Sequence, residues 1–460
     1  MMVDAFNNIK KILEEKIKFD NGSFFHNDVK EAVNKKNFLL ESAEKFGTPQ
    51  YFLDEAKLKQ RALFFMNTFK KYISNSEFFY AFKCNDLPFL IKTLKNISYN
   101  ADVASLFELK LALKLGFDKI IFTGPGKENE ELELAIKNND KVILNIDNFD
   151  ELERLAEILE KDKQNKKINV CIRLNPHDSV MEEWSKFGIE LKELDNTIKK
   201  IKEHPQLKLR GFHFHCSWNC TPDKYVENIG IIGKHLKDNF SAKDISELEF
   251  IDVGGGFYPE GNALLFKDTD KGKILSLLNN NEIDPHSIVI ENAEPLDNFG
   301  REISAALEKH IFPLSPSIKI YFEPGRFISM HSTTILTKVI SIKNNGAIVD
   351  GGANMVGDFR FSEYSFAPLV NLNDPSPLLN KKTIYGPLCH PSDLWGYSFF
   401  GKNIKKGDVI AVLNQGDYVF SYASRFIKPA APYIALTEEN KFVVVKEKEK
   451  FEERYFGCKF

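Results

Sequence analysis

Lys83 is the first residue whose surroundings suggest chemistry. It directly follows the apolar run FFYAF at 78–82, so its amine is expected to emerge from a partly desolvated strand end. Desolvation disfavours the ammonium form, and a neutral lysine amine is a nucleophile toward an aldehyde. Taken alone, the residue is more simply interpreted as a surface lysine whose amine reaches solvent.

Two further segments carry groups suited to a phosphorylated ring. DVGGGF at 252–257 runs from an apolar strand into three glycines, whose backbone N–H groups could cradle a phosphate. YFEPGRF at 321–327 places Glu323 and Arg326 around a Pro-Gly bend, which suits an acid for a ring nitrogen and a cation for a phosphate. A glycine turn and a surface ion pair are the simpler interpretations of each segment by itself.

Short β-type runs alternate with helix-like segments from about residue 77 to 323. The predicted strands are 77–83, 98–103, 119–123, 141–146, 168–174, 209–215, 247–253 and 318–323. Such alternation indicates parallel pairing with helical crossovers, and eight strands is the number that closes a (β/α)₈ barrel of TIM type. An open, doubly wound sheet is the alternative fold.

Chemistry in such a barrel lies at the carboxyl ends of the strands. Reading only those positions selects polar and glycine residues that are expected to converge on one mouth. They are Lys83, Asp102, Arg173, Asn175, His215, Gly254, Gly255, Gly256, Glu323 and Arg326.

The sequence pattern changes after about residue 328. Runs such as GDVIAVLN and KFVVVKEK are typical of β-strands separated by Gly, Asn and Pro turns. We therefore predict a barrel over 47–328 and a mostly β domain made from 1–46 and 329–460. The Asn/Asp-rich segment 257–292 is expected to be a long loop that could cover the site.

Composition narrows the classes of partner. The chain has 460 residues with 62 basic and 65 acidic side chains, and the resulting net charge of −3 argues against nucleic-acid binding. No apolar run approaches the length of a membrane span, and the six cysteines lack the C-x-x-C spacing of a zinc site. These features predict a cytoplasmic enzyme of small metabolites with free thiols and no metal.

Six motifs in order carry a family resemblance: YAFKCN, GFHFHC, DVGGGF, EPGR, GPLCHPSD and GDYVFSYAS. Together they resemble the fold-type III pyridoxal-phosphate enzymes, and more narrowly the ornithine/diaminopimelate/arginine decarboxylase family. The resemblance covers about 47–430. It implies a barrel that carries pyridoxal 5'-phosphate, and a β domain built from both ends of the chain.

The resemblance implies a role for each residue at the cofactor. Lys83 would bind the aldehyde of pyridoxal phosphate, Glu323 would keep the ring nitrogen protonated, and His215 would stack on the ring. An arginine in place of Glu323 would favour a racemase. His213 is expected to point away on the opposite strand face. The cofactor-supporting set would be completed by Asp102, Arg173, Gly254, Gly255, Gly256, Arg326 and Tyr418.

The second half of the site is implied by GPLCHPSD. Cys389 matches a cysteine that protonates the substrate carbon after decarboxylation, and Asp393 matches an acid that pairs with a distal amine. Arg360 could bind a substrate carboxylate. In this family these residues reach into a partner's barrel, so a homodimer with shared active sites is expected.

Departures from the family pattern leave the substrate open. After His215 the family continues with small residues and a phosphate-contacting serine, whereas this chain has Cys216, Ser217, Trp218, Asn219 and Cys220. Ornithine, lysine, diaminopimelate and an N-citryl diamino acid of carboxylate-siderophore biosynthesis all fit the resemblance. A diaminopimelate decarboxylase of lysine biosynthesis, an amino-acid racemase and a catalytically inactive regulatory homologue are the alternatives.

Overall fold

The chain folds into two compact units. The computed structural model describes residues 7–11, 18–20, 22–161, 167–175, 186–260, 262–265, 270–278, 288–357 and 367–460. The barrel unit comprises Lys59–Tyr258 and Glu294–Ile328, and the β unit comprises Met1–Leu58, Pro259–Ala293 and Ser329–Phe460.

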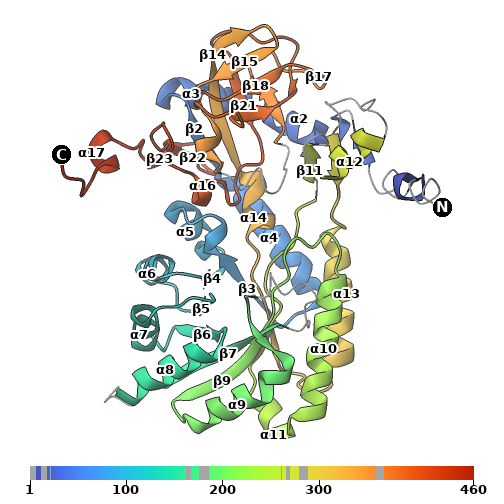
Figure 1. The fold of residues 1–460 in the computed structure, drawn as a ribbon, viewed down its shortest axis with the longest axis vertical. Helices are drawn as coiled ribbons and strands as arrows, with labels where there is room; N and C mark the ends of the chain where they lie inside the picture. Colours follow the sequence, from blue (N-terminus) through green and yellow to red (C-terminus); the bar gives the residue numbers. More distant parts are fainter. Residues whose placement is uncertain are drawn as a thin grey trace. The chain divides into compact units, whose positions relative to one another are not determined.

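Eight parallel strands form the barrel unit (Figure 1). They are β3 (Ser76–Ala81), β4 (Asn100–Val103), β5 (Ile120–Phe122), β6 (Val142–Ile146), β7 (Ile168–Asn175), β9 (Leu207–His213), β10 (Phe250–Asp252) and β13 (Lys319–Phe322). Each predicted strand overlaps one of them. Because β6 also pairs with β7, the sheet closes on itself, which confirms the (β/α)₈ barrel and excludes the open sheet.

Helices alternate with these strands on the outside of the barrel (Figure 1). They are α4 (Glu55–Tyr72), α5 (Pro88–Asn96), α6 (Leu106–Lys114), α7 (Asn129–Lys137), α8 (Phe149–Lys161), α9 (Leu194–Glu203), α10 (Asp223–Asn239), α11 (Ala242–Ser246) and α13 (Leu296–His310). Ser105 caps α6 by accepting the N–H of Glu108, and Gly116 follows with a φ of 73°, as the sequence predicts.

Aromatic side chains fill both the interior of the barrel and the layer beneath its helices. A buried interior cluster consists of Phe79, Ile121, Ile143, Cys171, Phe250 and Tyr321. Outside the strands, Phe69 of α4 packs on Phe322 of β13 with ring centroids 4.4 Å apart. Phenylalanine adds this buried area without requiring a hydrogen-bond partner, which suits a core so rich in it.

An 11-stranded sheet is the centre of the β unit. Its strands are β2 (Gln50–Asp54), β14 (Thr333–Lys343), β15 (Gly346–Val349), β16 (Leu369–Asn371), β17 (Leu379–Asn380), β18 (Thr383–Tyr385), β19 (Leu394–Gly396), β20 (Phe399–Phe400), β21 (Val409–Val412), β22 (Tyr433–Leu436) and β23 (Phe442–Lys446). The apolar faces of α2 (His26–Asn34) and α3 (Lys36–Phe46) contribute Val29, Leu39 and Ala43 to the core beside this sheet.

The β unit takes more of the chain than the sequence pattern indicates. Strand β2 pairs with both β14 and β22, so hydrogen bonding ties 50–54 to the β unit. Within the predicted loop 257–292, β11 (Asn262–Leu265) and β12 (Ile288–Glu291) pair with each other, and β12 pairs with β1 (Lys18–Asp20). These pairings are long-range, which is why local patterns did not reveal them.

A search of the helices in the described ranges finds none with the length and apolar character needed to cross a lipid bilayer.

Candidate active site

An ion pair joins two predicted site residues at the carboxyl end of the barrel. Lys83 lies in a 3₁₀ turn, Phe82–Cys84, directly after β3, and Asp102 lies in β4. Lys83 Nζ donates to Asp102 Oδ2 at 2.7 Å. Burial raises the pKa of the Asp102 carboxyl to about 6, repulsion by Glu323 adds to this rise, and the nearby ammonium opposes it.

Two further carboxyl groups lie buried in the same region. Glu323 follows β13, and Asp252 ends β10. Burial raises the pKa of both groups, and Asp252 is raised further by its contact with Glu323. Among the described residues, Asp102 Oδ1, Asp252 Oδ2 and Glu323 Oε1 are buried and receive no hydrogen bond. The mouth of the barrel therefore has an excess of acceptor oxygens over donors.

Two histidines of one chain segment face this acid group. His213, the last residue of β9, is fully buried, and its Nε2 lies 3.3 Å from Glu323 Oε2. His215 is half-buried, and its ring lies 6.5 Å from that of His213. One ring nitrogen of each histidine and one carboxylate oxygen of Glu323 lie within 4.8 Å of one another.

Both histidines are held in the neutral form. Burial lowers the pKa of His213 and of His215 well below its ordinary value, and the positive charges of Lys83 and Arg173 lower each further. The N–H of Gly255 donates to His215 Nδ1 at 3.2 Å, so this nitrogen is the acceptor and Nε2 carries the proton. Neutral His213 donates to Glu323 in the tautomer that carries the proton on Nε2.

His213 corrects a sequence-based prediction. It was expected to point away from the site, but it contacts Glu323. The reason lies in strand geometry, because side chains two residues apart in a strand lie on the same face. The pattern HFH should have predicted two histidines directed into one mouth.

The three glycines let neighbouring strand ends approach one another. A Cβ on Gly255 would lie 2.3 Å from the Glu323 carbonyl oxygen, and one on Gly256 would lie 1.6 Å from that of Cys216. Gly256 also has a φ of 85°, which L-residues rarely adopt. The N–H of Gly254 donates to Asp252 Oδ1 at 2.8 Å. The glycine segment thus positions His215 and Asp252 as well as forming part of the mouth.

Arg173 of β7 is oriented by a carboxylate that the sequence analysis did not select. Asp147, just after β6, is buried, and its Oδ1 accepts from Arg173 Nη1 at 3.2 Å. The Asp147 N–H donates to Glu151, which pairs at 2.8 Å with Lys127. Both members of this pair are buried, and Lys127 Nζ also donates to the carbonyls of Gly124 and Asn145. A satisfied buried ion pair therefore fixes the loops that hold Arg173.

Arg326 begins the short helix α14 (Arg326–Ser329) and is half-buried. Its guanidinium carbon lies 5.5 Å from the ring centroid of Trp218 and 5.4 Å from that of Tyr258. The structure therefore places Arg326, a predicted phosphate ligand, against the aromatic rings of Trp218 and Tyr258.

The remaining predicted residues belong to the β unit. Cys389 and its neighbour His390 are exposed. Tyr418 is half-buried with a φ of 49°, and it directly precedes α16 (Val419–Tyr422). Nothing is described for Arg360, which lies outside the described residues.

Asp393, predicted to pair with a substrate amine, is bound by backbone groups of its own unit. Its side chain is 4% exposed, and its two oxygens accept the N–H groups of Ala353 and Leu388, each at 2.6 Å. Bound in this way, the carboxylate organises the turn that carries Cys389. The exposed His390 is the more accessible polar neighbour.

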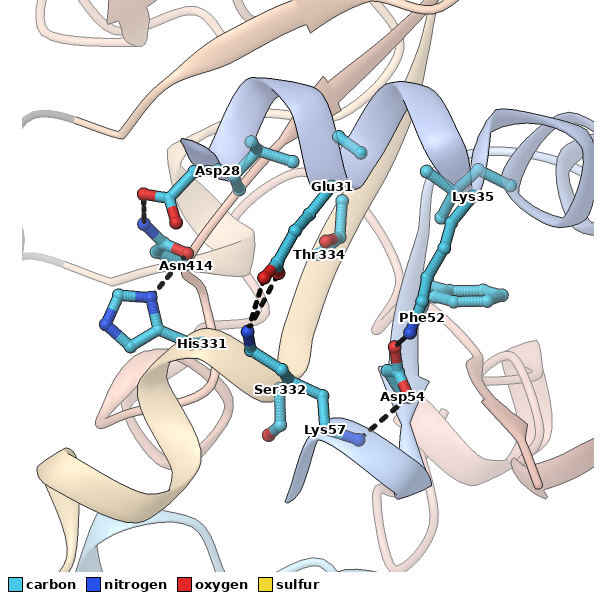
Figure 2. A pocket seen from close by; sticks show the side chains of 13 residues that line it. Asp28, Glu31, Lys35, Phe52, Asp54, Lys57, His331, Ser332, Thr334 and Asn414 are labelled. Atoms are coloured by element: carbon cyan, nitrogen blue, oxygen red, sulfur yellow. Dashed lines mark hydrogen bonds and ion pairs between the residues drawn. The ribbon is translucent and has the colours of Figure 1, made fainter. Parts of the chain in front are cut away.

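A separate pocket in the β unit lies between α2, β2 and the segments 331–334 and 413–414 (Figure 2). Its charged side chains pair across it: Lys57 Nζ contacts both oxygens of Glu31, and Lys35 pairs with Asp54. Asn414 links His331 to Asp28. These pairs tie the N-terminal helices to the sheet, and no predicted site residue lines the pocket.

Comparisons with known proteins identify the family. A profile described as "Pyridoxal-dependent decarboxylase, pyridoxal binding domain" matches residues 56–330. The chain belongs to the pyridoxal-dependent decarboxylase family. The cofactor is therefore pyridoxal phosphate and the reaction class is decarboxylation, which confirms the resemblance seen in the motifs.

Individual relatives share nearly the whole chain. Diaminopimelate decarboxylase of Aquifex aeolicus is 26% identical, with 90% of this chain and 92% of the relative covered. That of Methanothermobacter thermautotrophicus is 27% identical, with 92% and 96% covered. The crystal structure of diaminopimelate decarboxylase from Helicobacter pylori complexed with L-lysine superposes with a TM-score of 0.72 at 26% identity, over 90% of this chain and 98% of that chain.

The raised pKa of Asp102 predicts a pH-dependent stability of the cofactor-free decarboxylase. A carboxyl that holds its proton more tightly when folded makes the free energy of unfolding fall as pH rises from about 4 to about 6. One proton gives a slope of up to about 1.4 kcal/mol per pH unit. Asp102→Asn should reduce this slope in urea unfolding measured across that range. Asp118→Asn, at an exposed carboxyl, is the control, and equal slopes in wild type and Asp102→Asn would contradict the assignment.

The buried pair predicts a strong coupling between Lys127 and Glu151. Lys127→Met should lower the free energy of unfolding by about 3–5 kcal/mol, because it leaves a buried carboxylate unpaired. Adding Glu151→Gln should restore part of this loss, since the amide needs no counter-charge. Chemical denaturation of the two single variants and the double variant measures the coupling. If the losses in free energy of unfolding of the two single variants add up to that of the double variant, Lys127 and Glu151 are not energetically coupled.

Proposed function

We propose that this chain decarboxylates a diamino acid, with the predicted residues of the barrel mouth holding pyridoxal phosphate. The observation that carries the proposal is the Lys83–Asp102 ion pair at 2.7 Å, set beside the buried Glu323. The carboxyl groups of the mouth fit pyridoxal phosphate. Three of their oxygens receive no hydrogen bond within the described structure, and a protonated ring nitrogen would supply positive charge there.

Lys83 would supply the amine that holds the cofactor's aldehyde, and for this the amine would first lose a proton. Asp102 Oδ2, already hydrogen-bonded to Lys83 Nζ, is positioned to accept it. The pKa of this carboxyl, raised to about 6, lies close to neutral pH, which favours exchange of the proton in both directions.

Glu323 and Asp252 lie in contact, and each has one buried oxygen that receives no hydrogen bond, so a proton shared between the two carboxyls satisfies both oxygens. Glu323 would hold the ring nitrogen, and His213 Nε2 contacts its other carboxyl oxygen. His215, kept neutral and oriented by Gly255, offers a ring face for stacking.

The phosphate is assigned to Arg326, Tyr418 and the glycine segment, with Arg173 supporting the site. Arg326 brings a permanent positive charge. Tyr418 is fixed by the turn at Gly416, where a Cβ would lie 1.7 Å from the Ser329 carbonyl oxygen.

Bound pyridoxal phosphate supplies the electron sink that accepts the electron pair left when the substrate carboxylate departs as CO₂. Cys389 is assigned to protonate the substrate carbon that results. Its thiol is exposed, which fits a residue that acts in the active site of another subunit.

We assign Cys389 to the active site of a second copy, in a homodimer. His390 lies 6.4 Å, ring to ring, from Phe426, and Phe426 and Tyr422 are 49% and 54% exposed. Exposed aromatic side chains gathered beside an exposed thiol are typical of a surface that another chain covers. The described cysteines are all free of disulfides, which suits the cytoplasmic location assigned here.

Diaminopimelate is the first candidate substrate, because the named relatives that match most of the chain are diaminopimelate decarboxylases. An N-citryl diamino acid, as used in carboxylate-siderophore biosynthesis, is the second candidate. The bulky Trp218 beside Arg326 favours this second candidate, since the Trp218 side chain would change the shape of the substrate pocket.

A substrate panel tests the reaction. Holoenzyme incubated with diaminopimelate, ornithine, lysine, arginine and citryl-ornithine should release CO₂ from a diamino acid, with product masses identifying which one. Lys83→Ala should abolish both turnover and the visible absorbance of bound cofactor. CO₂ release by Lys83→Ala, or loss of substrate chirality without CO₂, would overturn the proposal.

Subunit mixing tests the shared site. Lys83→Ala and Cys389→Ala homodimers should each be inactive, and mixing them in equal amounts should restore about one quarter of wild-type activity. Cys458→Ala is the control for loss of an exposed thiol in the same unit. No recovery on mixing would show that Cys389 does not act across a dimer.

A further inference from the structure

Trp218 occupies a backbone conformation that its side chain does not favour. Its φ is 63°, in the left-handed region where a bulky L-residue is an outlier. Its side chain is 51% exposed, so burial of apolar area does not explain why the residue is there. A strained and exposed aromatic at the mouth of an active site calls for a functional reason.

The loop that carries Trp218 is fastened to the glycine segment. The N–H of Asn219 donates to the Gly256 carbonyl at 2.9 Å, and the N–H of Tyr258 donates to the Asn219 carbonyl at 3.2 Å. Asn219 Nδ2 closes the loop by donating to the Cys216 carbonyl at 2.9 Å. The backbone of Trp218 is therefore held in register with Tyr258.

This register places two aromatic rings against one guanidinium. The ring centroids of Trp218 and Tyr258 are 6.3 Å apart with an angle of 27° between the planes. The Arg326 guanidinium carbon lies at nearly equal distances from them, 5.5 Å and 5.4 Å. Both distances fall within the range of a cation–π contact.

We propose that Trp218 and Tyr258 form an aromatic clamp that positions Arg326 for the phosphate of the cofactor. Arginine side chains lose considerable rotamer freedom when they bind a ligand, and restricting the side chain beforehand lowers this cost. Trp218 is thus a positioning residue that acts through Arg326, and this inference rests on the proposed cofactor site.

The variant Trp218→Gly distinguishes an effect on cofactor binding from an effect on the stability of the fold. Glycine accepts the left-handed conformation, so the Tm of the cofactor-free variant should stay unchanged or rise. Removing the ring should nevertheless raise the Kd for pyridoxal phosphate by about 2-fold to about 30-fold, the range of a cation–π contact. Trp218→Phe, which keeps a ring, should lie between wild type and Trp218→Gly. Phe107→Leu, at an exposed aromatic of the same unit, is the control and should leave the Kd unchanged.

Two comparisons show whether the effect passes through Arg326. Binding of pyridoxal, which lacks the phosphate, should be equally strong in wild type and Trp218→Gly. In an Arg326→Met background, Trp218→Gly should no longer weaken binding of pyridoxal phosphate, because the group it positions is gone. Equal losses for pyridoxal and pyridoxal phosphate, or an undiminished loss in the Arg326→Met background, would overturn the clamp.

Failure of the clamp and failure of the cofactor site give different results. If Arg326→Met alone leaves the Kd for pyridoxal phosphate unchanged, Arg326 is not a phosphate ligand, and the proposed site itself is wrong there. If Arg326→Met weakens binding but Trp218→Gly does not, the site stands and the clamp is rejected.

Discussion

The burial of three carboxyl groups at one end of a closed barrel is the constraint on which the site depends. Asp102, Asp252 and Glu323 come from strands distant in sequence, and closure of the barrel brings them together. Burial in a medium of low dielectric constant disfavours the ionised form and raises the pKa of each carboxyl, and repulsion by Glu323 adds to the rise for Asp102 and Asp252. The region therefore takes up protons and attracts cations. The ammonium group of Lys83 supplies one positive charge, and the protonated ring nitrogen of the cofactor would supply another.

The loops around these acids are fixed by contacts that leave little freedom. The glycine segment is pressed against neighbouring strand ends so closely that a single Cβ would displace backbone. On another side of the mouth, Lys127 and Glu151 hold Asp147, and Asp147 holds Arg173. Such fixed surroundings favour catalysis because the polar groups need not reorganise during the reaction.

Sequence patterns located the barrel well and the β unit less completely. Each barrel strand is a short apolar run with its own helix, so local periodicity was sufficient. Strand β2 and the segment 259–293 join the β unit through long-range pairing, which no local pattern encodes. At the candidate site, Lys83, Asp102, Glu323 and His215 were selected from the sequence because they lie in or directly after the carboxyl ends of predicted strands. Asp147, Lys127 and Glu151 were missed because their importance lies only in what they contact.

The sequence by itself determined the family, the cofactor and the strand ends at which polar residues gather, because motif order and periodicity are local properties of the chain. Only the tertiary structure decided how those residues share charge. Burial makes His213 and His215 neutral. Contacts between distant segments give Asp393 two backbone N–H donors and bring Trp218 to Arg326. Charge state, desolvation and close contact depend on neighbours from distant parts of the chain, and these neighbours are assembled only when the barrel closes and the loops dock on it.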